Sequence, residues 1–326
     1  MARIGIISFA HMHAYSYAES LNQTPNAEFV AAWDADAKRG KAAAQQFGVK
    51  FAKDLDAFLK SDIDAVIICS ENVRHREHVE KAAKAGKWIL CEKPLATNIE
   101  DAKAMVAACK KAGVGLGTAF PVRYCPPVME ARDRIASGEM GKVIAASCTN
   151  NGSFPGGWFA DPALSGGGAV MDHTVHVADA MRWILGREFA KVYCESGTFF
   201  AKGIKVDDVG SLHLETEDGI IVSHIASWNR PASFPTWGDV TLEIICENGV
   251  VNVDAFNQKV NVYNNDRMKA EWAYWGANPD TGLVADFITA VDERREPPVT
   301  GVDGLRAVEV TVAALKSAET GRMVKV

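Results

Sequence analysis

Short apolar runs alternate with longer amphipathic stretches over the first 120 residues. The brief apolar runs predict five strands, at Ile4–Ser8, Phe29–Trp33, Ala65–Cys69, Trp88–Cys91 and Gly115–Phe120. The amphipathic stretches, each followed by a glycine that can end a helix, predict helices that include Lys38–Phe47, His75–Ala85 and Asp101–Ala112. Strands that alternate with helices in this way are typical of a parallel sheet with helices on both faces.

Beyond Pro121 the pattern changes to one of hairpins. Asp218-Gly219 and Asn248-Gly249 lie between alternating apolar runs, and such dipeptides favour two-residue hairpin turns. They predict two antiparallel pairs, Ser211–Thr216 with Ile220–Trp228 and Val240–Cys246 with Val250–Asp254. The runs expected to complete this mostly antiparallel sheet are Lys142–Thr149, Lys191–Thr198 and Lys259–Tyr263.

Three helical patterns in this half are expected to cover only one face of the sheet. They lie at about Ala169–Leu185, Leu283–Asp292 and Asp303–Ala318. We therefore predict an α/β chain with two domains, 1–121 and 122–326, the second an α+β domain with an open-faced sheet. An uncovered sheet face favours self-association, so we expect a homodimer or homotetramer formed through it.

Composition and charge narrow the class of protein. The 326 residues are 48% hydrophobic and 23% charged, which is an ordinary globular balance. The net charge is −6 and no basic run occurs, so we expect no nucleic-acid partner. The longest apolar runs are shorter than a membrane span, and the N-terminus lacks the pattern of a signal peptide. Seven cysteines without a C-x-x-C motif predict reduced thiols in a cytoplasmic protein. The short apolar runs predict no membrane partner.

The first strand leads through a short turn into a helix, the arrangement that holds a pyrophosphate in dinucleotide-binding domains. The three glycine places of the usual G-x-G-x-x-G motif fall here on Ser8, Ala10 and His13. Asp34 follows the second strand, where a carboxylate can accept both hydroxyls of a ribose and repel a 2′-phosphate. The pattern therefore predicts NAD rather than NADP, although the cations Lys38 and Arg39 lie close by in the sequence.

His11-Met12-His13 has a second interpretation. Two imidazoles that leave one strand end can share a metal ion, as in barrel hydrolases. A barrel needs about eight successive strand–helix units, and this chain turns antiparallel after about five. We therefore expect no metal, and a metal-dependent hydrolase that uses His11 and His13 is the least favoured function.

Two other segments carry candidate catalytic residues. Glu92-Lys93-Pro94 follows a strand at the carboxyl end of the sheet, where ligands bind in such folds. In Ser165–Asp179, three glycines precede a helix whose Asp172, His176 and Asp179 share one face. A carboxylate beside an imidazole suits proton transfer near neutral pH. Asp179 is expected to pair with Arg182.

The motifs in these segments and around them are together similar to a known family. They are the stretches from Asp64 to His75, from Ala85 to Ala96 and from Ser165 to Asp179, and Asp303-Gly-Leu-Arg-Ala-Val-Glu-Val. In this order they resemble the Gfo/Idh/MocA oxidoreductases, which include glucose–fructose oxidoreductase and inositol dehydrogenases. The resemblance implies a Rossmann domain that binds NAD(P), an open-faced sheet domain, and a sugar or polyol substrate between the two.

The resemblance also implies roles for individual residues. Lys93, Asp172 and His176 match the family's catalytic positions. The residues implied to contact the cofactor are Phe9, Ala10, His11, Met12, Asp34, Ser70, Asn72, His75 and Glu92. The residues implied to contact the substrate are Arg123, Tyr124, Trp158 and His173. The chain departs from the family at the three glycine places and at Glu71, where proline is usual.

The function predicted from these residues is a reversible, NAD-dependent oxidation of a secondary hydroxyl of a sugar or cyclitol. His176 is expected to take the hydroxyl proton, Lys93 to stabilise the developing alkoxide, and Asp172 to orient the substrate or the imidazole. The alternative is a sugar or dinucleotide sensor on the same fold without catalysis, which the missing glycines favour.

Overall fold

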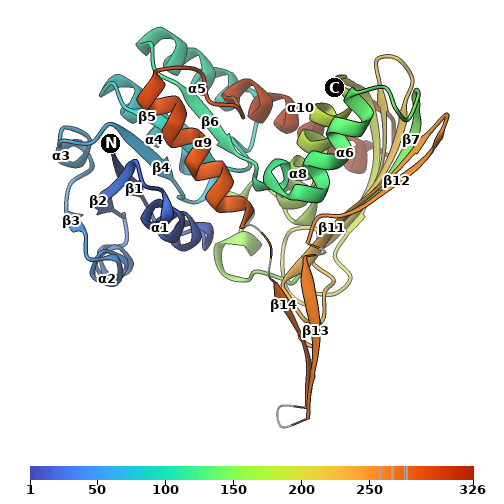
Figure 1. The fold of residues 1–326 in the computed structure, drawn as a ribbon, viewed down its shortest axis with the longest axis horizontal. Helices are drawn as coiled ribbons and strands as arrows, with labels where there is room; N and C mark the ends of the chain where they lie inside the picture. The colour runs from blue at the N-terminus through green and yellow to red at the C-terminus, as the bar shows by residue number, and fades with distance from the viewer. Residues whose placement is uncertain (257, 266–267, 275, 277) are drawn as a thin grey trace. The chain divides into compact units, whose positions relative to one another are not determined.

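The computed structural model describes residues 1–256, 258–265, 268–274, 276 and 278–326 (Figure 1). The chain divides into two compact units. The first comprises Met1–Pro121 and Pro279–Val308, and the second comprises Val122–Asn278 and Glu309–Val326. A division into functional domains at residue 121 stays a prediction, and in its contacts the segment 279–308 belongs with the first unit.

The first unit is built on a parallel sheet in the order β3-β2-β1-β4-β5-β6. Its strands are β1 (Ala2–Ile7), β2 (Ala27–Trp33), β3 (Lys50–Ala52), β4 (Ala65–Ile68), β5 (Trp88–Glu92) and β6 (Leu116–Ala119). All residues of β4 are buried, as expected of a central strand covered on both faces. The strand order reverses between β1 and β4, which is the ligand-binding point of a doubly wound sheet. The predicted parallel α/β sheet is confirmed.

Helices cover both faces of this sheet because the crossovers on either side of the reversal run in opposite directions. They are α1 (His13–Gln23), α2 (Ala37–Phe47), α3 (Leu55–Leu59), α4 (His75–Lys84), α5 (Ile99–Ala112) and α9 (Pro279–Glu293). Helix α1 packs with α9, and α4 packs with α5. Gly48 and Gly113 end α2 and α5 with φ angles of 67° and 69°, as the sequence predicted.

The second unit contains a seven-stranded sheet in the order β12-β11-β7-β10-β9-β8-β15. The strands are β7 (Val143–Gly152), β8 (Phe189–Gly197), β9 (Val209–Thr216), β10 (Ile221–Ser227), β11 (Gly238–Cys246), β12 (Gly249–Asp254) and β15 (Val324–Lys325). Both predicted hairpins form, β9 with β10 and β11 with β12, and only β7 and β10 pair in parallel. The helices that belong wholly or partly to this unit are α6 (Pro126–Ala136), α7 (Pro162–Ser165), α8 (Ala169–Leu185) and α10 (Gly301–Thr320).

Two expectations for this unit were wrong. The run Lys259–Tyr263 lies in β13 (Lys259–Asn264), which pairs with β14 (Lys269–Tyr274) in a separate two-stranded sheet. The run Leu283–Asp292 lies in α9, which packs on α1 and β1 of the first unit and does not cover the antiparallel sheet. An apolar periodicity shows that an element buries one face, but it does not identify the surface that face meets.

Helix α8 packs on β7, β9 and β10. Along β10 and β11 buried residues alternate with more exposed ones, and the more exposed residues lie on the opposite face of the sheet. Ile221, Ala145, Ile245 and Val250 form a cross-strand row on that face, one residue from each of β10, β7, β11 and β12. The three larger side chains in the row are 38% to 50% exposed. Among the residues that the structure describes, no helix is both long and apolar enough to cross a membrane.

The buried ring of His78 on α4 makes the stability of the first unit depend on pH. Burial lowers its pKa from 6.5 to about 4. The unfolded chain therefore binds this proton at a higher pH than the folded chain, and the free energy of unfolding falls as the pH drops through that interval. Between about pH 7 and about pH 5 this group accounts for a loss of about 2 kcal/mol.

Urea denaturation of the wild type and of His78→Gln at the two pH values measures this loss. We expect the variant to lose about 2 kcal/mol less than the wild type on acidification. An equal loss in the two proteins would contradict the assignment to His78.

Candidate functional site

The turn after β1 lies at the point where the strand order of the first unit reverses. Ser8 stands at the first glycine place and has a φ angle of 72°, in the left-handed region that glycine normally supplies. Its backbone N–H donates to the carbonyl of Trp33 at 2.7 Å, and the N–H of His11 donates to the carbonyl of Cys69 at 2.9 Å. The turn thus keeps the backbone shape of the glycine motif, and α1 begins at His13 with its N–H groups at this edge. These features fit a pyrophosphate.

Asp34, which follows β2, is 3% exposed and makes more hydrogen bonds than its sequence position suggests. Its Oδ2 accepts from the backbone N–H of Phe9 at 2.7 Å and from Nε of Arg39 at 2.8 Å. Its Oδ1 accepts from the N–H of Asp36 at 2.8 Å and from Nη2 of Arg39 at 2.7 Å. A carboxylate offers about four lone-pair sites, so Arg39 takes two of the places that ribose hydroxyls would need.

The ends of β4 and β5 are tied together by His75. Its ring is fully buried, with Nδ1 3.0 Å from the carbonyl of Pro94 and Nε2 3.1 Å from the carbonyl of Ser70. The Lys93–Pro94 peptide bond is cis, and Lys93 is 3% exposed. His75 therefore contacts the backbone of two predicted site segments and fixes one against the other. Asn72, in the 3₁₀ turn before α4, is also buried.

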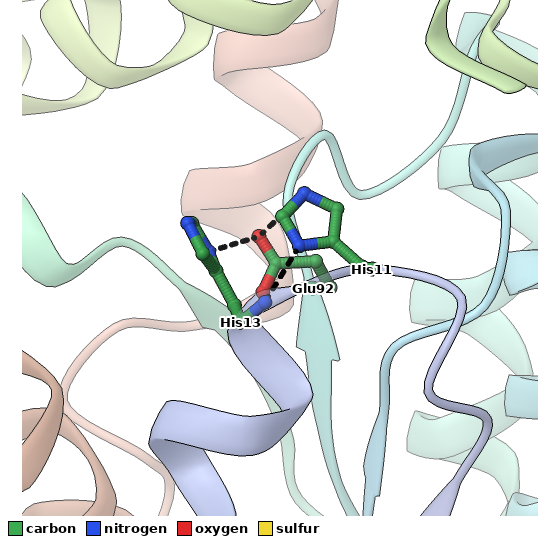
Figure 2. Close-up of side chains that lie close together, drawn as sticks. All are labelled: His11, His13 and Glu92. Carbon is green, nitrogen blue, oxygen red and sulfur yellow. Dashed lines mark hydrogen bonds and ion pairs between the residues drawn. The ribbon is translucent and has the colours of Figure 1, made fainter. Parts of the chain in front are cut away.

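Glu92 at the end of β5 lies against both histidines of the turn (Figure 2). Its Oε1 is 3.3 Å from Nδ1 of His13 and 4.0 Å from Nε2 of His11. The hydroxyl of Tyr17 donates to Oε2 at 2.7 Å. The Glu92 side chain is 0% exposed, whereas that of His13 is 29% exposed. The sequence analysis considered His11 and His13 as a pair and Glu92 separately, and it gave no sign that the three form one cluster.

The charges of this cluster stabilise one another. Burial opposes the ionisation of Glu92, but His11, His13 and Lys93 outweigh it and hold the pKa of the carboxyl well below its usual range. Burial likewise opposes protonation of His13, but Glu92 outweighs it and raises the pKa of the imidazole. Burial raises the pKa of Asp280 on α9, whose carboxylate accepts a hydrogen bond from the hydroxyl of Ser16. The cluster is an ionic site at the carboxyl edge of the sheet.

In the second unit, the predicted residues of α8 are buried where the helix packs on the sheet. Asp172 accepts from Nε1 of Trp228 at 3.1 Å and lies 3.3 Å from Nε2 of His173. Nδ1 of His173 in turn lies 2.9 Å from the carbonyl of Asn150 on β7. His176, one turn after Asp172, is 5% exposed on the same helical face. Asp172 is therefore oriented by Trp228 and His173, two contacts that the sequence did not predict.

The expected pairing of Asp179 with Arg182 stays a prediction, while the structure shows a partner of Asp179 that the sequence did not predict. Asp179 accepts two hydrogen bonds from Arg123, at 2.7 Å and 2.5 Å, and both side chains are buried. Arg182 also pairs with Glu188, at 2.5 Å. The Arg123 guanidinium reaches the buried Asp179 carboxylate in a fork geometry, which stabilises a buried charge well.

Three predicted substrate contacts have defined surroundings within the second unit. Arg123 lies in the ion pair with Asp179, and Tyr124 is half-buried beside it in the same 3₁₀ turn. Trp158 stacks on Phe159 with 4.0 Å between the ring centroids and packs against the cluster that contains Trp228. Trp158 is thus linked by packing to the indole that holds Asp172.

The glycines before α8 serve the chain's own packing. A Cβ at Gly168 would lie 1.8 Å from the carbonyl oxygen of Asp207. The Asp207 carboxylate accepts from the N–H groups of Gly168 and Val170, at 3.2 Å and 2.7 Å, and so caps the start of α8. This close approach fixes where the helix begins, and hence where Asp172 and His176 lie.

A parallel sheet of this order, a turn shaped for a pyrophosphate and a second antiparallel sheet define a dinucleotide-binding oxidoreductase fold. Residues 2–120 match the model of an oxidoreductase family with an NAD-binding Rossmann fold, and residues 128–252 match the C-terminal domain of the same family. The chain belongs to the Gfo/Idh/MocA oxidoreductase family. A nicotinamide cofactor follows from this membership.

Relatives match along nearly the whole chain. The 1,5-anhydro-D-fructose reductase of Ensifer adhaerens is 29% identical over 310 residues, 92% of this chain and 91% of its own. The myo-inositol 2-dehydrogenase of Thermotoga maritima is 28% identical over 338 residues, 99% of this chain and 98% of its own. Among solved structures, GenD2 from gentamicin A biosynthesis, in complex with NAD, is similar with a TM-score of 0.91 at 26% identity, covering 100% of this chain and 96% of its own.

Replacement of Gly168 by alanine tests the close approach at the start of α8. Because a backbone oxygen must move to admit the methyl group, we expect Gly168→Ala to lower the free energy of unfolding by about 2–3 kcal/mol. Gly203→Ala is the control, since Gly203 has a φ angle of 77° but open space around it. It should lose about 1 kcal/mol through backbone strain alone. Urea denaturation measures both losses, and a smaller loss at Gly168 than at Gly203 would refute the packing argument.

Proposed function

We propose that this protein catalyses the reversible NAD-dependent oxidation of a secondary hydroxyl of a sugar or cyclitol. The observation that carries the proposal is the match to both domains of an NAD-binding oxidoreductase family, combined with the presence of Lys93, Asp172 and His176. The names of the relatives, a reductase of an anhydrosugar and an inositol dehydrogenase, support this class of substrate.

Three residues carry the proposed chemistry. The bound nicotinamide supplies the hydride acceptor. His176 takes the hydroxyl proton as a general base, and Lys93 donates a hydrogen bond to the developing alkoxide. Asp172, fixed by Trp228 and His173, orients the substrate or the imidazole. Residues 1–121 are proposed as the cofactor domain and 122–326 as the substrate domain.

The other predicted site residues enter the proposal with separate tasks. The backbone of Phe9–Met12 and the start of α1 hold the pyrophosphate, and Asp34 binds the ribose. The residues proposed to border the cofactor further along are Ser70, Asn72, His75 and Glu92. The residues proposed to contact the substrate are Arg123, Tyr124, Trp158 and His173.

A panel of substrates tests the function. Sugars, inositols and sugar acids are each incubated with NAD and with NADP, and formation of the reduced nicotinamide is followed by absorbance. We expect turnover of at least one sugar or cyclitol. Dinucleotide binding in calorimetry without turnover of any compound in the panel would instead favour a sensor.

Substitution of Lys93 and His176 separates catalysis from cofactor binding. We expect Lys93→Met and His176→Ala to lower kcat by about 10²-fold or more and to leave the Kd for NAD nearly unchanged, because neither side chain is proposed to hold the adenosine half. Lys84→Met, at an exposed lysine of α4, is the matched control with normal turnover. Since His176 must be neutral to accept a proton, alcohol oxidation should fall towards acidic pH. Near-normal kcat in either variant would refute its role.

Arg39 provides a sharp test of cofactor preference. We expect tighter binding of NAD than of NADP because the Asp34 carboxylate opposes a 2′-phosphate. Arg39→Ala frees two lone-pair sites of Asp34 and removes the nearest guanidinium, so it should weaken NADP binding by about 10-fold while NAD binding is kept or strengthened. Lys38→Ala, at the exposed neighbouring cation, should change neither affinity. Calorimetry measures the six affinities, of NAD and NADP for each of the three proteins, and wild-type binding of NADP as tight as NAD would contradict the prediction.

The open face of the seven-stranded sheet is proposed as the oligomer interface. The exposed apolar row of Ile221, Ile245 and Val250 would be buried there against a second copy. We expect a homodimer or homotetramer in light scattering, and a shift towards the monomer in Ile245→Lys. A monomeric wild type would exclude this interface.

A further inference from the structure

His11, His13 and Glu92 bring three metal-ligand groups together from segments about 80 residues apart. Their ligand atoms all lie within 4.8 Å of one another. Figure 2 shows both imidazole rings directed at the same carboxylate, and the ring centroids of the two histidines are 4.4 Å apart. Among the described residues, no other group of three histidine, cysteine or acidic side chains is close enough to share one ion.

The donor set suits a borderline-soft divalent ion. Two imidazoles and one carboxylate are the three protein ligands of open zinc sites, and the fourth position is left to water. Bonds of about 2.0–2.2 Å in a tetrahedral site place ligand atoms roughly 3.3–3.6 Å apart. The observed separation of 3.3 Å between Glu92 and His13 is in that range, and the 4.0 Å between Glu92 and His11 exceeds it by about 0.4 Å.

The surrounding residues hold these ligands in position. The Tyr17 hydroxyl bonds Oε2 of Glu92 and leaves Oε1 facing both imidazoles, which is the kind of support that orients carboxylate ligands in metal sites. Glu92 and His11 are buried on the end of β5 and on the turn that is bonded to Cys69. His13 is partly exposed and the least buried of the three, so the remaining coordination position is accessible on its side.

The charge of the site also suits a dication. Asp280 adds a second carboxylate within electrostatic reach of His13. Nδ1 of His11 accepts from the backbone N–H of His13 at 3.2 Å, and Nε2 is the ring nitrogen that lies near Glu92. A neutral imidazole that binds a metal through Nε2 carries its proton on Nδ1, so metal binding would require His11 to give up the hydrogen bond from the N–H of His13.

We propose that His11, His13 and Glu92 form a binding site for one divalent transition-metal ion of the zinc class. The site goes beyond the oxidoreductase function and needs neither dinucleotide nor sugar to fill. It lies at the carboxyl edge of the first unit's sheet. Its ligands are Glu92, which directly precedes Lys93, and His11 and His13, which lie in the turn after β1 and at the start of α1.

Titration of the full chain with metal alone tests the proposal. After removal of metal with a chelator, Zn²⁺, Co²⁺ and Mg²⁺ are added separately without nucleotide and followed by calorimetry. We expect one equivalent of Zn²⁺ or Co²⁺ per chain, visible absorption bands of four-coordinate Co²⁺, and no binding of Mg²⁺, which prefers oxygen ligands. Failure to bind Zn²⁺ at about 0.1 mM would overturn the proposal, while the oxidoreductase function would be unaffected.

Variants locate the ion. His13→Ala and Glu92→Gln should each weaken Zn²⁺ binding by at least 10- to 100-fold, and Tyr17→Phe, which keeps all three ligands, by about 10-fold. His213→Ala removes a half-buried imidazole on β9 and is the matched control with unchanged affinity. Circular dichroism confirms that each variant is folded. His13→Ala changes the least buried of the three ligands, so we expect it to disrupt packing least. Zn²⁺ affinity in folded His13→Ala equal to that of the wild type would place the ion elsewhere and refute the site.

Discussion

The parallel alignment of the strands in the first unit is the constraint on which its chemistry depends. Parallel strands all end at the same edge, and the reversal of order between β1 and β4 separates the crossover helices there. The turn after β1, Asp34 after β2 and Glu92 at the end of β5 therefore converge, although they lie far apart in the sequence. The N–H of His11, bonded to the carbonyl of Cys69, holds the turn across the reversal.

Buried carboxylates organise both units because a buried charge requires partners. Glu92 gathers His11, His13 and Tyr17, and Asp34 gathers Arg39 and the N–H groups of the loop. In the second unit Asp179 does the same for Arg123. The bonds that stabilise the fold thus compete with ligands for the same oxygen atoms. If the ribose binds at Asp34, as we propose, Arg39 must give up its two bonds to that carboxylate.

Much of the fold could be predicted from the sequence, and less of the site. Turn dipeptides and alternation predicted the pairs β9–β10 and β11–β12, since local pattern determines a hairpin. Arg123 was missed as a partner of Asp179 because helical spacing considers only neighbours along the chain, and Arg123 lies 56 residues away. Tyr17 and Trp228, which bond Glu92 and Asp172, carried no motif that could have revealed them.

The sequence by itself determined the kinds of element, the parallel and antiparallel sheets, and the family, because these follow from periodicity, turn chemistry and motifs close together in the chain. Only the tertiary structure decided which surface α9 covers, that β13 leaves the main sheet, and that Glu92 joins two histidines into one ionic cluster. The physical reason is that an apolar face must be buried and a buried charge must be paired, which the sequence pattern shows. The packing of distant segments then decides which surface covers the apolar face and which group pairs with the charge.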